Sequence, residues 1–218
     1  MTNPLQKYFR QPKIYVRLPS SGNFYPPGAI EMTETGEFPV FAMTAKDELM
    51  FKTPDALLNG QSTVDVIQSC VPNIKNAWAM PSIDVDAVLV AIRIATYGES
   101  MEVRVDIPNT EITKDYEVDL RHVLDSLSQS SFEPILEIND DIVLQIRPLT
   151  YRETTINTTR TLEEQRIFTI VNDEEMSDED KIAVFNQSFR RLTDLTVGTV
   201  SQAIAAIKTP DGIIQERE

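Results

Sequence analysis

The chain has 218 residues, of which 41% are hydrophobic and 25% charged, the proportions of a soluble globular protein with one or two domains. Its net charge of −14 disfavours nucleic acid as a partner, because binding to phosphates depends on Lys and Arg. No apolar run approaches the roughly 18 residues of a membrane span, and the N-terminus lacks the apolar core of a secretory signal, so we expect a cytosolic protein with no membrane contact.

Residues 1–12 are predicted to form an N-terminal arm, because two prolines interrupt regular structure there. Tyr8, Phe9 and Arg10 lie in the most basic part of this acidic chain. The arm is either a solvated tail that frays or a strap that becomes ordered on a partner. A purely disordered tail usually lacks aromatic residues, so Tyr8, Phe9 and Arg10 are candidate partner-binding residues.

Residues 13–148 are predicted to form an α+β core that begins with two strands. Residues 13–18 alternate between polar and apolar, the pattern of a half-buried strand. Residues 37–43 predict a second strand, and Pro39 indicates that it lies at an edge, because proline cannot donate a ladder hydrogen bond.

A loop over residues 18–28 connects these strands and contains three prolines and two glycines. Proline fixes φ and glycine permits positive φ, so we expect the loop to hold one shape. Its aromatic residues, Phe24 and Tyr25, either fold back onto the body of the protein or contact a partner. Both alternatives stay open, and Phe24 and Tyr25 join the candidate partner-binding residues.

Residues 44–98 are predicted to form a bundle of short helices, because helix caps and breakers recur there at short intervals. Apolar residues at helical spacing supply the core of this bundle. The predicted starts and stops are Thr44 with Asp47, Thr53 before Pro54, Gly60 as a stop, Ser62 with Asp65, Ser82 or Asp84, and Gly98 as a stop.

Residues 100–147 return to strict alternation and predict two β-hairpins that together form a small antiparallel sheet. A short helix that carries His122 is expected between the hairpins, over residues 121–127. The paired segments are 101–107 with 115–120, and 135–138 with 142–146.

Residues 149–218 are predicted to form a C-terminal helical hairpin. A capping box of Thr150 and Glu153 starts the first helix. The second starts at Ser177, after a turn with six acids in eight residues, and its apolar stripe continues to Ile207. Whether this hairpin packs on the sheet or projects toward a partner stays open.

The motifs of catalysis and nucleotide binding are missing from the sequence. It has no Walker A loop, no glycine-rich dinucleotide loop and no His-Glu-x-x-His pattern. Cys70 is the single cysteine, which excludes an intramolecular disulfide, and the single histidine is 52 positions away at His122. We interpret Cys70 as a small buried hydrophobic residue on a helix. We therefore predict no enzyme activity, no catalytic residues and no cofactor.

Several of these segments, including LPSSGNFYPPG at 18–28, TAKDEL at 44–49 and TPDALLNG at 53–60, resemble the baseplate hub proteins of contractile-tailed phages of the T-even type. The resemblance runs from about residue 13 to residue 125 and is weaker in the C-terminal third. The other segments that carry it are residues 66–72, 91–98 and 116–120. Some members of the family carry paired cysteines in the first hairpin, as in a zinc knuckle. This chain has Asp106, Pro108 and Asn109 there, so we predict no metal.

The resemblance implies a non-enzymatic structural or assembly component of the tail baseplate hub. Its partners would be other tail or baseplate proteins, with self-association left open. An alternative is an assembly chaperone that holds the tape measure or a hub protein and is absent from the virion. A cell-wall hydrolase is a further alternative, which needs a cleft with a perturbed carboxyl group. The expected location is the tail baseplate of the virion, or the host cytoplasm during assembly.

Overall fold

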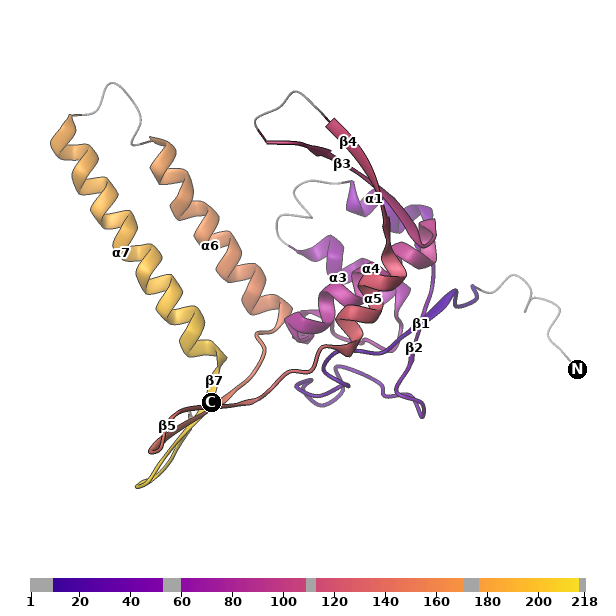
Figure 1. The fold of residues 1–218 in the computed structure, drawn as a ribbon, viewed down its shortest axis with the longest axis horizontal. Helices are drawn as coiled ribbons and strands as arrows, with labels where there is room; N and C mark the ends of the chain where they lie inside the picture. Colours follow the sequence, from indigo (N-terminus) through magenta and orange to yellow (C-terminus); the bar gives the residue numbers. More distant parts are fainter. Residues whose placement is uncertain (1–9, 53–59, 109–112, 171–176, 216–218) are drawn as a thin grey trace, which may run out of the picture. The chain divides into compact units, whose positions relative to one another are not determined.

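The computed structural model describes residues 10–52, 60–108, 113–170 and 177–215 (Figure 1). The chain divides into two compact units, Met1–Phe132 and Glu133–Glu218. Tyr8 and Phe9, the predicted helix start at Thr53 and Pro54, and most of the predicted acidic turn lie outside the described residues. The α+β class, with small antiparallel sheets and hairpins, is confirmed. No helix within the described ranges is both long and apolar enough to cross a membrane.

The first unit begins with the two predicted strands, β1 (Ile14–Val16) and β2 (Phe38–Val40), which pair antiparallel. They form a sheet of their own, so both are edge strands, which explains why Pro39 is tolerated in β2. Val16 and Phe38 face the core and are almost fully buried.

Helix α1 (Ala45–Phe51) starts as predicted. The Thr44 hydroxyl accepts a hydrogen bond from the amide of Asp47, and the Asp47 carboxylate accepts one from the amide of Thr44 at 2.7 Å. This capping box satisfies two amide groups that have no partner inside the helix.

The other two predicted caps in the described part of the bundle are wrong. Helix α3 (Gln61–Cys70) follows Gly60, whose φ is +75°, and no side chain caps it. Ser62 instead is buried and donates a hydrogen bond to the carbonyl of Met50 at 3.0 Å. Helix α4 (Ser82–Tyr97) follows Pro81, also without a side-chain cap. Contacts between elements have overridden the local capping preference of these side chains.

Helix α4 is the centre of the first unit and packs against β1, β2, α3 and α5. The short 3-10 helix η2 (Ala77–Ala79) also packs against α3 and carries the half-buried Trp78. Buried apolar residues of α3 and α4 form about half of the core: Val64, Val66, Ile67, Cys70, Val85, Ala87, Val88, Ala91, Ile92, Ile94 and Ala95.

The first hairpin consists of β3 (Ser100–Asp106) and β4 (Thr113–Asp119), and α5 (Leu120–Gln129) follows it as predicted. The Asp119 carboxylate caps α5 by accepting from the amide of Arg121 at 2.9 Å. The prediction that both hairpins form one sheet is wrong, because β3 and β4 pair only with each other.

The second unit contains a four-stranded antiparallel sheet and two helices, α6 (Tyr151–Ile170) and α7 (Asp178–Ala203). The sheet order is β5-β6-β7-β8, and the strands are β5 (Ile135–Asn139), β6 (Ile142–Ile146), β7 (Ile204–Thr209) and β8 (Gly212–Gln215).

The predicted extension of the last helix to Ile207 is wrong. The helix ends at Ala203, and β7 pairs with β6 and then with β8. A short apolar run fits a helical stripe and a strand equally well. Pairing with the free edge of β6 decides in favour of a strand, because it supplies backbone hydrogen bonds along the whole segment.

Glu153 stabilises the start of α6, as the predicted capping box requires. It accepts from the amide of Thr150 at 2.7 Å and from two nitrogens of Arg147 at 2.7 and 2.9 Å. The Arg147 hydrogen bonds are the main reason why the pKa of Glu153 falls to about 2.

We expect Glu153→Gln to lower the free energy of unfolding by about 1–2 kcal/mol at pH 7. The pKa of Glu153 is lower in the folded chain than its ordinary value of 4.5, so its contribution is present above pH 4.5 and is lost as the pH falls toward 2. Urea unfolding at pH 7 and pH 3.5 measures this difference. Glu163→Gln, on an exposed position of the same helix, is the control. The prediction would be contradicted if wild type and Glu153→Gln lost the same free energy of unfolding between pH 7 and pH 3.5.

Candidate partner-contact surfaces

Arg10, the described end of the predicted arm, is attached to the body of the first unit. Its guanidinium donates to the carbonyl of Ser69 at 2.9 Å and to the carbonyl of Ala42. It also lies 3.7 Å from the Asp47 carboxylate and 5.6 Å from the ring centroid of Phe41. Arg10 therefore fixes the chain where β2, α1 and α3 meet.

We expect Arg10→Ala to destabilise the first unit by about 1–2 kcal/mol, because two carbonyl groups and the Asp47 carboxylate lose a charged donor. Chemical denaturation of the full chain measures the effect. Lys13→Ala is the matched control, because the Lys13 side chain is exposed and this substitution also removes one positive charge. An effect of Arg10→Ala no larger than that of the control would show that the attachment contributes nothing to stability.

Cys70 has none of the properties of a nucleophile. Its side chain is fully buried, and burial raises the pKa of the thiol to about 11 despite a 3.4 Å contact from Arg10. His122 is exposed on α5. The prediction that Cys70 is a small buried residue on a helix is confirmed.

The 18–28 loop is tied to the core by Asp84, which is fully buried near the start of α4. One carboxylate oxygen accepts from the amide of Ser20 at 2.8 Å. The other accepts from the Ser20 hydroxyl at 2.5 Å and from the Tyr25 hydroxyl at 3.0 Å. Tyr25 therefore folds back onto the body of the unit. The sequence prediction interpreted Asp84 only as a helix cap and missed this role. A usable signal was present, because Asp84 is an acidic residue directly before the apolar residues that form the buried face of α4.

Phe24, next to Tyr25 in the chain, lies at the surface. Its φ is +68°, and its ring packs edge-on against Phe132 with centroids 5.4 Å apart. The side chain is still 40% exposed, so Phe24 can contact a partner without a change of conformation. Of the five predicted residues, Arg10 and Tyr25 make internal contacts to different elements and Phe24 is partly exposed. Tyr8 and Phe9 lie outside the described residues.

The described part of the second unit buries few side chains. Among its residues with described side chains, only Pro148, Ser188 and Ala206 are buried. Polar pairs join α6 and α7: Asn157 donates to Gln202 at 3.0 Å, and Arg191 pairs with Glu164 at 3.3 Å. A groove of about 380 Å³ remains between the two helices.

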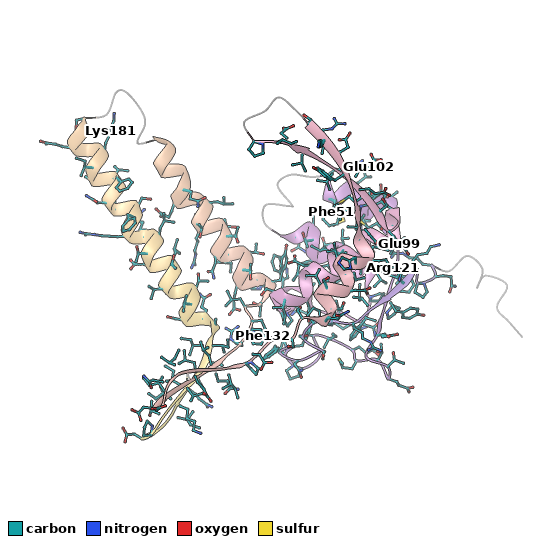
Figure 2. All side chains as sticks on the ribbon, in the orientation of Figure 1. Phe51, Glu99, Glu102, Arg121, Phe132 and Lys181 are labelled. Carbon is teal, nitrogen blue, oxygen red and sulfur yellow. The ribbon has the colours of Figure 1, made fainter. Side chains whose placement is uncertain are left out.

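An apolar stripe follows α7 on residues at helical spacing, and side chains project from this helix from Lys181 onward (Figure 2). Phe185 and Phe189 stack with their centroids 6.5 Å apart, and their side chains are 47% and 59% exposed. The α7 stripe consists of Ile182, Phe185, Phe189, Val197 and Val200, all of them exposed.

One face of the four-stranded sheet is also apolar. Leu136, Leu144, Ile207 and Ile214 are directly opposite one another in the register, so their side chains form a row across all four strands. The two outer members, Leu136 and Ile214, are exposed. The sequence prediction missed this sheet face because it placed Ile207 on a helix.

Comparison with protein-family models gives a match over residues 12–210 to the model described as T4 bacteriophage base plate protein. No curated protein and no solved structure matches the chain.

Proposed function

The chain belongs to the T4 bacteriophage base plate protein family, and from this premise we propose that it is a non-enzymatic structural or assembly component of the tail baseplate hub. It acts through contacts with other tail or baseplate proteins. Its place is the baseplate of the virion, or the host cytoplasm while the hub assembles.

The small number of buried side chains in the described part of the second unit carries this proposal. A chain segment of this length normally buries most of its large apolar side chains, because burial of each contributes about 1.5–3 kcal/mol. Here the α7 stripe and the apolar face of the sheet remain open. Open apolar faces of this extent mark surfaces that another protein covers.

The first unit provides the stable body from which smaller contact elements extend. Phe24 is an exposed aromatic on a loop that Asp84 holds rigid, and rigid aromatics are favoured anchors at interfaces. In this proposal residues 1–12 act as a strap that Arg10 fixes at one end.

An assembly chaperone is the second candidate, and the geometry of α6 and α7 favours it. Two long helices that are joined by polar pairs and carry an exposed apolar stripe on α7 suit transient binding of a helical client such as a tape measure protein. Such a chaperone leaves before the particle is complete.

The hydrolase alternative receives no support from the described carboxyl groups. Burial raises the pKa of Asp84, despite hydrogen bonds from Ser20 and Tyr25, as a catalytic acid would require. Asp84 is nevertheless fully buried, and both of its oxygens are occupied by these hydrogen bonds.

Quantitative mass spectrometry of purified phage particles separates the two candidates. A fixed copy number of a few per tail identifies a structural subunit of the hub. Absence from particles, despite synthesis in infected cells, identifies an assembly chaperone. The hub assignment would be contradicted if the copy number of the protein in the particle matched that of a part of the baseplate outside the hub.

A further inference from the structure

A groove of about 360 Å³ lies between α1 and α4 in the first unit, away from the 18–28 loop contacts of Asp84. Its walls are mainly apolar and come from Met43, Phe51, Leu89 and Ile92. Phe51, labelled in Figure 2, is the last residue of α1. The volume is at the lower end of the range for binding pockets and admits one large side chain with its neighbouring polar group.

Arg93 gives this groove an unsatisfied charge. Its Nη1 atom is buried, and among the described residues it has no hydrogen-bond partner and Arg93 has no ion pair. Its guanidinium lies 4.6 Å from the ring centroid of Tyr97, which holds the group in place. A buried donor without an acceptor costs about 1–3 kcal/mol, and more when it is charged, so the site is incomplete without an acceptor.

The charges around the groove favour an anionic group. Lys52 and Arg93 contribute two positive charges and Glu48 one negative charge, so the described wall carries one net positive charge. A guanidinium binds a carboxylate through two parallel hydrogen bonds, and the apolar walls require an apolar group beside that carboxylate. A bare phosphate lacks the apolar part.

We propose that this groove binds a segment of another baseplate protein in which an Asp or Glu side chain is next to a large apolar side chain. The carboxylate pairs with Arg93, and the apolar side chain lies against Leu89 and Ile92. Membership in the base plate family supplies only the class of partner, namely another baseplate protein. The argument for the groove uses residues of the first unit and none of the exposed apolar residues of the second unit.

The test uses the full chain and two capped dipeptides, acetyl-Phe-Asp-amide and acetyl-Phe-Asn-amide. They differ only in that the side-chain carboxylate of Asp is replaced by the neutral amide of Asn. NMR titration that follows the Nε–Hε signal of Arg93 gives the affinities. We expect the Asp peptide to bind at least about fivefold more tightly, since charge-assisted hydrogen bonds are roughly twice as strong as neutral ones. Arg93→Gln should remove this preference, whereas Lys13→Gln should retain it.

A second variant keeps the test valid if Arg93→Gln does not fold. Leu89→Glu places a carboxylate inside the groove, so it should abolish binding of the Asp peptide. Equal binding of the two peptides, no binding of either in the millimolar range, or an unchanged preference in Arg93→Gln would overturn the proposal. Peptide binding does not depend on the hub role, so the two proposals can fail separately.

Discussion

Replacement of Phe185 and Phe189 on α7 by glutamate is expected to abolish production of infectious phage while the purified chain remains folded. Both side chains are about half exposed in the isolated chain, so each substitution should cost about 1 kcal/mol, at most half of what full burial contributes. In an interface the same positions would be buried, and an unpaired carboxylate there costs several kcal/mol.

The expected loss is at least about 100-fold in phage titre, because roughly 3 kcal/mol of binding free energy corresponds to more than a factor of 100 in affinity. Complementation of a phage that lacks this gene measures the titre, and circular dichroism of the purified variant checks the fold. Gln187→Glu adds a carboxylate at an exposed position of α7 outside the α7 stripe, and it should complement normally. Normal titre with both phenylalanines replaced would remove the α7 stripe as a contact surface.

Replacement of Asp84 by alanine is expected to give the largest loss of stability in the first unit, about 2–4 kcal/mol. The amide and hydroxyl of Ser20 and the hydroxyl of Tyr25 would lose their acceptor at a site that water does not reach. The 18–28 loop would lose its attachment to α4. Urea unfolding measures the first effect, and faster hydrogen exchange of the loop amides reports the second.

The deficit of Asp84→Ala should also depend on pH. Burial raises the pKa of Asp84, so the folded chain binds this proton more tightly than the unfolded chain. The stability that this linkage adds is fully present below the ordinary pKa of 3.8 and is lost as the pH rises through the raised value. The difference between wild type and Asp84→Ala should therefore be larger at pH 4 than at pH 7.

Asp86→Ala is the control for this prediction, because Asp86 is exposed on the same helix and carries the same charge. Its effect should stay below about 0.5 kcal/mol at both pH values. If Asp84→Ala and Asp86→Ala have the same free energy of unfolding, Asp84 does not hold the 18–28 loop.

The sequence by itself determined the elements whose signals are local. The capping boxes at Thr44 and Thr150 form as predicted, because each depends on side chains and amides within one helical turn. The alternating residues around Ile14 and Phe38 form the predicted strands for a similar reason, since a period of two defines one buried face. Family resemblance added the baseplate context from short motifs.

Only the tertiary structure decided which side chains meet across the chain. Asp84 has the sequence signature of a helix cap, but Ser20 and Tyr25, about 60 positions away, turn it into the buried acceptor of a loop. Residues 204–209 fit a helix and a strand equally well, and the free edge of β6 made them a strand. Arg93 shows its unsatisfied nitrogen only once α1 and α4 are side by side. Caps and alternation are properties of neighbouring residues, whereas burial and hydrogen-bond satisfaction depend on groups that only the folded chain brings together.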